Sequence, residues 1–281
     1  MYAKLLSVLS VHYILRPASH MILFDEEPPD TPEWQCACRL ATCMPTSLKT
    51  HEFGRAIVSE VDATDRFASD KRGRCGNTQL DLLRIDTLLE RGGGAFLDLD
   101  VFILRNRLDR CRRSTTIGSD AFGRLNPGVI LAPPRAAFLR RWRHSFRDVD
   151  LTARDFGSRC NHTAELAAAA NRETPSHPVV RAARELGPLP RYVRKSAYEA
   201  HIRHAPVAHL SAFRHEWRLR DVMRARLLER VWDRVSAAIN ATVAADPTDV
   251  ACSDPIIAGC LQTIRGACWA RPGGQCGIYG A

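Results

Sequence analysis

The sequence predicts an α/β protein, in which segments typical of strands alternate with segments typical of helices. The clearest evidence lies at residues 77–104, where apolar residues at helical spacing are followed, after three glycines, by a strand-like apolar run. Further apolar runs at 129–132 and 207–210 are typical of strands, and helical segments separate them. With 281 residues, 45% of them hydrophobic, the chain is long enough for one large domain or two small ones.

The N-terminal part predicts a helix, a strand and a loop. The helix covers residues 2–15 and ends before Pro17, as helices do ahead of proline. Its apolar part, 5–15, is too short for a membrane span and lacks a small-residue cleavage site, so we interpret it as a core helix rather than a weak signal peptide. A buried strand is expected at 20–27, and a proline-rich loop at 28–38.

The middle of the chain predicts a strand and then the strongest helix. Alternating apolar residues indicate a short strand at 56–65. The helix at 77–90 can be capped by Asn77 or Thr78, and the glycines that follow it are typical of a helix end.

The later part predicts two more helices and an appendage. Helices are expected at 136–148 and 217–245. The segment 246–281 is rich in glycine and cysteine, and we expect it to be irregular. The predicted organisation is therefore one α/β domain over 1–245 with a tail over 246–281.

The charge is strongly basic, with a net value of +9, and only Lys4, Lys49, Lys71 and Lys195 are lysines. Arginine binds phosphates and carboxylates with two hydrogen bonds at once, so an anionic partner is one interpretation of this composition. The other is a solvated surface with an arginine bias, which we favour because the arginines are spread along the chain. No nucleic-acid-binding pattern is present, and we expect no nucleic-acid partner.

The ten cysteines indicate disulfides rather than a zinc site. Cys252, Cys260, Cys268 and Cys276 recur every eight residues, but no pair has C-x-x-C spacing. An even number of scattered cysteines is typical of an oxidising lumen. Two glycosylation sequons, at Asn161 and Asn240, agree with that compartment.

Two aspartates interrupt the apolar run at 95–104. Strand alternation predicts that Asp98 and Asp100 share one face, with Cα atoms about 6–7 Å apart. At that separation both carboxylates can approach one divalent cation, and oxygen ligands suit Mg²⁺ or Mn²⁺. The alternative is a pair of surface acids on an exposed edge strand.

The preceding helix adds two charged residues. Asp81 and Arg84 are three residues apart and therefore share a helix face. Gly92, Gly93 and Gly94 permit close approach of the backbone to a ligand. A cation with nearby donors is what a departing metal–diphosphate group requires. The alternative for Asp81 and Arg84 is an ion pair on a helix surface.

This stretch, Leu80–Arg105, resembles glycosyltransferase family 32, the DXD-motif sugar transferases that include initiation-specific α-1,6-mannosyltransferases and α-1,4-galactosyl- and N-acetylglucosaminyltransferases. The family pattern is D-x-x-R, a leucine-rich helix, then G-G-x-[YF]-x-D-x-D. The matching positions are Asp81, Arg84, Gly93, Gly94, Phe96, Asp98 and Asp100. The resemblance continues at 126–142 and 205–213, and covers about residues 5–215.

The resemblance implies a GT-A fold, which is a Rossmann-like nucleotide-sugar-binding domain, and a retaining reaction that depends on Mn²⁺ or Mg²⁺. It implies that Asp98 and Asp100 bind the metal and the donor's ribose or diphosphate. Asp81 and Arg84 are similar to residues that grip the donor sugar and phosphate, and Asn126 falls where the family lines the acceptor side of the sugar. The resemblance places donor binding at Asp81, Arg84, Gly93, Gly94, Asp98, Asp100 and Asn126, and metal binding at Asp98, Asp100 and His209.

Three positions depart from the family pattern. The family has a base-binding strand before its first helix, whereas here Met1 falls directly at the helix. We therefore expect a GT-A fold without its first strand, in a chain that is a fragment of a longer protein. Three glycines replace the usual pair, and Ser211 stands where tryptophan is common.

The expected activity is transfer of a hexosyl or N-acetylhexosaminyl group from a UDP-sugar or GDP-mannose to a glycan, lipid or protein-linked acceptor. The expected location is the Golgi or secretory lumen, with the membrane reached only through a segment outside this chain. The alternative is a catalytically degenerate GT-A relic that acts as a binding protein.

Overall fold

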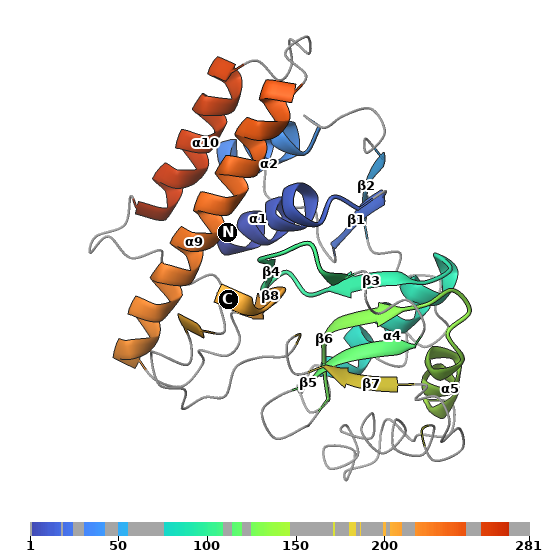
Figure 1. Ribbon diagram of the computed structural model, residues 1–281. Coiled ribbons are helices and arrows are strands. Elements are labelled where there is room, and N and C mark those ends of the chain that lie inside the picture. Colours follow the sequence, from blue (N-terminus) through green and yellow to red (C-terminus); the bar gives the residue numbers. More distant parts are fainter. Residues whose placement is uncertain are drawn as a thin grey trace. The chain divides into compact units, whose positions relative to one another are not determined.

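The computed structural model contains both helices and strands, in agreement with the predicted α/β class (Figure 1). It describes residues 2–17, 19–24, 31–42, 50–55, 76–108, 114–119, 125–146, 171, 180–183, 186, 199–200, 203–209, 217–245 and 254–269. The strand predicted at 56–65 and the sequon at Asn161 lie outside these residues. Within them, no helix has the length and apolar character that crossing a membrane requires.

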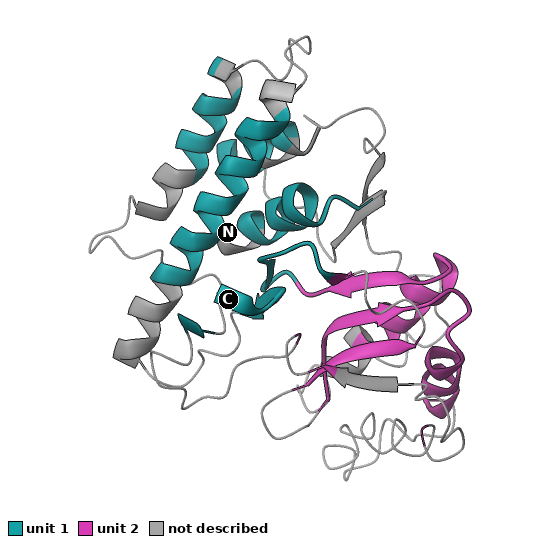
Figure 2. Ribbon diagram, viewed as in Figure 1, with its two compact units in different colours: residues 1–56, 99–107, 189–281 teal, residues 57–98, 108–188 magenta. Residues whose placement is uncertain are grey.

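The chain forms two compact units, and each draws on separated stretches of sequence (Figure 2). Unit 1 contains residues 1–56, 99–107 and 189–281, and unit 2 contains residues 57–98 and 108–188. This division differs from the predicted one, because residues 246–281 group with unit 1 and residues 1–245 are shared between both units.

Unit 1 is built mainly from helices around an apolar core. The predicted N-terminal helix is confirmed as α1 (Tyr2–Ser10), which continues into the π-helical turn η1 (Val11–Leu15). The long predicted helix is confirmed as α9 (Trp217–Ala245). Leucines of α1 pack with apolar residues of α9, and this burial stabilises the unit. The core residues of these elements are Leu5, Leu6, Leu9, Tyr13, Leu227, Leu228, Val231, Trp232, Val235 and Ile239.

Two small sheets belong to unit 1. The predicted strand near residue 20 is confirmed as β1 (Ser19–Phe24), which pairs in parallel with β2 (Thr50–Arg55). The strand β4 (Val101–Ile103) pairs antiparallel with β8 (Val207–His209).

Serines of α1 fix the position of β4. The Ser7 hydroxyl donates to the Val101 carbonyl at 2.6 Å, and the Ile103 amide donates to the Ser10 hydroxyl at 2.9 Å. These bonds satisfy buried polar groups on both sides, so the short strand is held against the helix as well as against β8.

The segment predicted to be a proline-rich loop is instead largely a helix, α2 (Pro32–Thr42). Pro32 occupies the first helical position, where its missing N–H costs nothing, and its fixed φ angle favours the helix. The Thr31 hydroxyl accepts a hydrogen bond from the Trp34 amide at 3.3 Å, as a helix cap does. The prediction was wrong because Pro32 was interpreted as a residue that prevents a helix, whereas it begins this one.

The tail predicted to be irregular contains a helix, α10 (Asp254–Trp269). Ile257, Cys260 and Ile264 are spaced at helical intervals, and all three are buried in the core of unit 1. The glycines and cysteines of this segment obscured that apolar stripe in the sequence.

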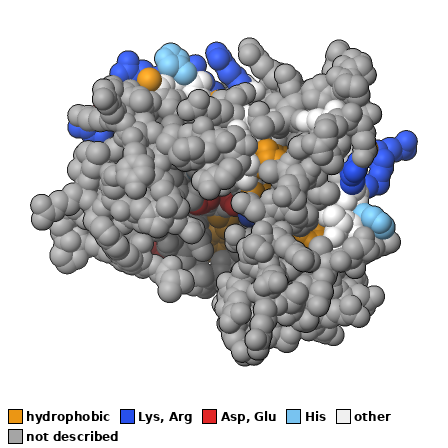
Figure 3. Space-filling model, turned by 90° about the horizontal axis from the view of Figure 1, so that it is seen from below, with side chains coloured by type: hydrophobic (Ala, Val, Ile, Leu, Met, Phe, Trp, Pro, Cys, Tyr) orange, Lys and Arg blue, Asp and Glu red, His pale blue; other side chains and the backbone are white. Residues whose placement is uncertain are grey.

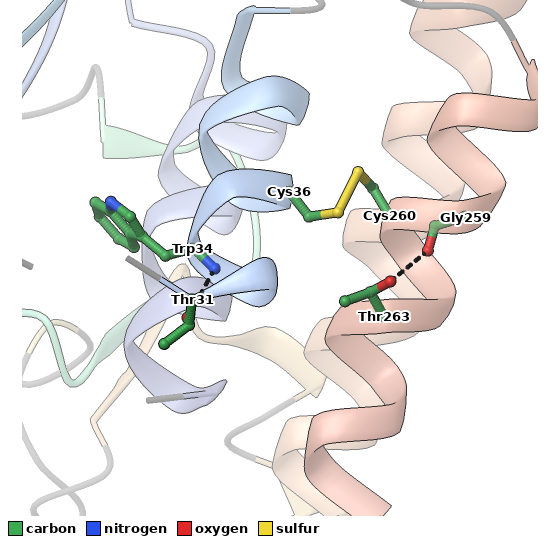
Figure 4. The surroundings of a disulfide bond; sticks show 6 residues. All are labelled: Thr31, Trp34, Cys36, Gly259, Cys260 and Thr263. Carbon is green, nitrogen blue, oxygen red and sulfur yellow. Dashed lines mark hydrogen bonds between the residues drawn. A yellow bond between two sulfur atoms is a disulfide. The ribbon is translucent and has the colours of Figure 1, made fainter. Parts of the chain in front are cut away.

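A disulfide joins α2 to α10, between Cys36 and Cys260 (Figure 4). It links positions 224 residues apart, so it closes most of the chain into one loop. The disulfide prediction is confirmed for this pair. The remaining cysteine side chains lie outside the part of the chain whose side chains are described.

Unit 2 is a sheet covered by two helices. Its four strands lie in the order β3 (Gly94–Leu97), β6 (Leu125–Ala132), β5 (Thr115–Ser119), β7 (Val180–Ala183). β6 runs antiparallel to both of its neighbours, and β5 and β7 are parallel. The predicted helices are confirmed as α4 (Gly76–Glu90) and α5 (Ala137–Ser145). The core is formed by Leu82, Ile85, Leu88, Ile117, Ile130, Phe138, Leu139 and Trp142.

The run predicted as one strand over 95–104 is broken at its aspartates. β3 ends at Leu97 and pairs with β6, whereas β4 begins at Val101 and pairs with β8. Leu99 and Asp100 form a turn between the two strands. The expectation of strict side-chain alternation through Asp98 and Asp100 was therefore wrong, because aspartate disfavours strands and the two halves have different partners.

Candidate functional site

Helix α4 carries the first two residues of the candidate site. Asp81 and Arg84 are only 7% and 6% exposed, although both are charged. Leu82, Ile85 and Leu88 of the same helix enter the core of unit 2, which fixes the helix against the sheet. The predicted shared face is confirmed by a contact of 2.7 Å between Arg84 Nη1 and Asp81 Oδ1. The alternative of a surface ion pair is wrong, since the pair is buried.

Arg84 also pairs with Asp98, at the end of β3. Its Nη2 atom donates to both carboxylate oxygens of Asp98, at 2.7 and 2.8 Å, and its Nε atom donates to Oδ1 at 3.1 Å. The guanidinium carbon also lies 5.8 Å from the centre of the Phe96 ring, within cation–π range. All three guanidinium nitrogens are therefore engaged by Asp81 and Asp98.

Strand β6 holds Asp98 from the other side. The Asp98 amide donates to the Gly128 carbonyl at 2.9 Å, and the Gly128 amide donates to the Asn126 side-chain oxygen at 3.0 Å. The register of β5 against β6 shifts at Ile117 and Gly118, so β6 is irregular where Asn126 lies. Asn126 thus supports the backbone that anchors Asp98.

The three glycines make the turn between α4 and β3. The amide of Gly93 donates to the Leu88 carbonyl at 2.8 Å and that of Gly92 to the Leu89 carbonyl at 3.3 Å, a Schellman pattern at the helix end. Gly92, Gly93 and Gly94 all have positive φ angles, of 73°, 102° and 120°. A Cβ atom at Gly93 would lie 2.7 Å from the Ala132 carbonyl oxygen, so no other residue fits there without movement.

The Asp81 carboxyl has an altered acidity. Burial raises its pKa to about 6, and the Asp98 charge acts in the same direction. The Arg84 guanidinium opposes this by its charge and its hydrogen bond. Burial is the largest cause, so Asp81 is less acidic than an exposed aspartate, yet it is mainly ionised at neutral pH.

Unit 1 carries the other two residues predicted to bind metal. Asp100 is partly buried in the turn directly before β4. His209 is 4% exposed and lies opposite Val101 in the β4–β8 ladder. The β-ladder therefore brings His209 next to the residue that follows Asp100.

The structure places some of the residues predicted to bind the donor or the metal in one hydrogen-bonded cluster. Asp81, Arg84 and Asp98 form one hydrogen-bonded cluster, which we call the Arg84 cluster. Gly93 shapes the turn beside it, and Asn126 supports it through Gly128. Among the described residues, no three histidine, cysteine, aspartate or glutamate side chains gather as a metal-binding group.

Acidic side chains are visible on one face of the molecule, near the middle of Figure 3, beside hydrophobic ones.

Two contacts in the Arg84 cluster were not foreseen from the sequence. One is the pairing of Arg84 with Asp98, and the other is the Phe96 ring against the guanidinium. The signal for Phe96 was present, since it is two residues before Asp98 and strand alternation places both on one face. The pairing depends on how α4 packs on β3, which spacing alone does not give.

Comparison with known proteins gives no relative: no protein-family model matches the chain, and no curated protein matches it.

Proposed function

We propose that the protein is a metal-dependent, retaining glycosyltransferase that moves a hexosyl or N-acetylhexosaminyl group from a nucleotide sugar to an acceptor hydroxyl. The observation that supports this most is the Arg84 cluster. In it, a buried arginine orients the carboxylate of Asp98, which lies just after the end of β3. Asp81 and Asp98 already pair with Arg84, so a purely structural cluster needs no further carboxylate. A further aspartate, Asp100, nevertheless follows Asp98 after a single residue.

The chemistry of these donors fits a hard divalent cation. Asp98 and Asp100 offer carboxylate oxygens, and their Cα atoms cannot be more than about 7 Å apart because one residue joins them. Arg84 uses part of the Asp98 acceptor capacity, but a carboxylate has about four lone-pair sites, and the Asp98 side chain is 30% exposed. Mg²⁺ commonly binds one or two carboxylates and completes its shell with substrate phosphates.

A bound Mn²⁺ or Mg²⁺ would supply positive charge against the departing nucleoside diphosphate. Asp98 and Asp100 would hold the ion, and His209, beside the start of β4, is the proposed third ligand. Arg84 acts through Asp98: because its nitrogens are occupied, we assign it to orienting that carboxylate rather than to gripping a phosphate. Asp81 in turn fixes Arg84.

The fold and compartment that accompany this proposal are a GT-A domain and the secretory lumen. The sheet of unit 2, with α4 and α5 packed on it, supports the α/β part of the fold assignment. The Cys36–Cys260 disulfide supports an oxidising compartment. The proposed partners are a UDP-sugar or GDP-mannose donor and a glycan or glycolipid acceptor.

The test is the substitution Asp100→Asn. We expect Mn²⁺-dependent hydrolysis and transfer from a panel of UDP-sugars and GDP-mannose to fall by at least about a hundredfold, as for the loss of a transition-state charge contact. Asp86→Asn is the matched control, since Asp86 lies on α4 but pairs with Arg143 instead. Undiminished activity of Asp100→Asn would refute the proposed role of the motif.

A second candidate is a relic that binds without turnover. One observation favours it: Arg84 holds both carboxylate oxygens of Asp98, so part of the acceptor capacity that a metal would use is taken up within the protein. Calorimetric titration of the same nucleotide sugars with and without Mn²⁺ separates the two. Absence of metal-dependent binding for every one of these donors would favour the relic.

A further inference from the structure

A group of arginines lies on unit 1, apart from the Arg84 cluster. Arg230 and Arg234 are one turn apart on α9 and therefore share a face of the helix. Arg105, just after β4, approaches the same face, because Arg234 Nη1 donates to the neighbouring Leu104 carbonyl at 2.5 Å. We call Arg105, Arg230 and Arg234 the arginine triad.

The three charges of the triad are close enough to affect one another. The pKa of the Arg234 guanidinium is lowered, first by burial and then by the charges of Arg105 and Arg230. All three side chains are partly buried. Like charges brought together at a partly dry surface cost free energy unless an opposite charge compensates them.

No carboxylate of the described residues forms an ion pair with the triad. Glu199 pairs with two other arginines, Arg226 and Arg203, at 3.1 and 3.9 Å. Glu229 and Asp233 of α9 flank the arginine face, but both are exposed, and neither forms a salt bridge within the described part of the chain.

Backbone contacts hold two of the guanidinium groups in place. Arg234 uses one donor on the Leu104 carbonyl, and Arg105 Nη2 donates to the Arg203 carbonyl. Each arginine has five N–H donors, so most donors remain for a ligand. Positioned guanidinium groups lose little side-chain entropy on binding, which favours a specific site over a diffuse surface charge.

We propose that the arginine triad binds a phosphate or sulfate group. Phosphate and sulfate carry the negative charge that balances the three arginines. Guanidinium groups bind such tetrahedral oxyanions with paired hydrogen bonds. The group belongs either to a free anionic molecule or to a lipid headgroup, since both present the same chemistry.

The site is distinct from the proposed donor site. None of its arginines is among the residues assigned to the donor or the metal, and Arg105 follows β4 whereas Asp100 precedes it. The proposal therefore does not depend on the glycosyltransferase activity.

The experiment is calorimetric titration with pyrophosphate and with sulfate, in chelator and on the Asp100→Asn background, so that metal-dependent binding cannot contribute. We expect binding by the parent and a loss of affinity of roughly tenfold or more in Arg230→Gln. Arg230 is the preferred position because no hydrogen bond to it is found among the described residues. Arg140→Gln is the matched control, an exposed arginine on α5.

A second arm uses sedimentation with phosphatidylcholine vesicles, with and without phosphatidylinositol phosphate. Binding of pyrophosphate alone identifies a soluble anion, and binding of the anionic vesicles alone identifies a lipid headgroup. In either case we expect Arg230→Gln to lose this binding and Arg140→Gln to retain it. Absence of binding in both arms, or equal binding by both variants, would overturn the proposal.

Discussion

The two units of this protein use arginine in opposite ways. In unit 2, Arg84 is almost completely buried, and its nitrogens donate to two aspartates. In unit 1, Arg105, Arg230 and Arg234 are only partly buried and repel one another, with no carboxylate paired to them in the described residues. A buried charge with matched partners is part of the folded structure, whereas a gathering of unmatched charges is a surface suited to a ligand.

The units also differ in what holds them together. Unit 2 depends on a buried ion pair and on a turn that only glycine fits. Unit 1 has a helical core and a disulfide between α2 and α10. This comparison teaches that a substitution of the same chemical kind should have a very different effect in each unit.

The largest effect is expected from Arg84→Ala. It leaves Asp81 buried without its cation and Asp98 without its partner, so the free energy of unfolding should fall by about 3–5 kcal/mol. Arg230→Ala should change it by less than about 0.5 kcal/mol. Urea denaturation of both variants measures the difference, and a similar loss in the two would break the comparison.

The next effect concerns the disulfide of unit 1. Replacing Cys36 and Cys260 by serine should cost about 2–5 kcal/mol, because the unfolded chain regains the freedom that a very long closed loop removes. Hydrogen exchange should show the loss in α2 and α10, with α4 and β6 of unit 2 still protected. Uniform loss of protection across both units would mean that they unfold as one.

A smaller effect separates two glycines of unit 2. Gly93→Ala should cost about 3 kcal/mol, since the new methyl group meets the carbonyl of Ala132 and the φ angle is positive. A Cβ atom at Gly92 would meet nothing within 4 Å, so only the positive φ angle opposes Gly92→Ala. We expect this variant to lose about 1 kcal/mol of stability. Thermal unfolding of both variants tests this order. Equal costs would show that close packing at Gly93 contributes nothing.

The last prediction concerns the pH dependence of the stability of unit 2. The pKa of Asp81 is near 6 when folded and near 3.8 as a free side chain, so the folded state binds its proton more tightly. Stability from this group is fully present below about pH 4 and is lost as the pH rises through 6, by an amount on the order of 2 kcal/mol. Asp81→Asn should flatten the stability profile between pH 4 and 6. A parent profile with no decline in that window would contradict the raised pKa.

Elements whose evidence is local were predictable from the sequence. The helix at 77–90 and the long helix at 217–245 follow from apolar spacing within a few turns. The shared face of Asp81 and Arg84 follows from the same period. By contrast, α2 and α10 were missed because Pro32 and the C-terminal glycines dominated the interpretation of their segments.

Features that depend on distant partners were not predictable. The break at Asp98–Asp100 arises because β3 and β4 pair with strands from different parts of the chain. The pairing of Arg84 with Asp98 needs the packing of a helix on a sheet. The arginine triad joins Arg105 to a helix more than a hundred residues later, and no local pattern marks it.

The chain order of the two units has a consequence for biosynthesis. Residues 57–188, which contain all of unit 2, leave the ribosome before α9 and α10 exist. The leucines of α1 therefore cannot complete their packing until α9 and α10 have been made, and Cys36 cannot form its disulfide until Cys260 has been made. A nascent chain of this protein should accordingly depend on chaperones that cover its first helix, and on thiol catalysts that act late.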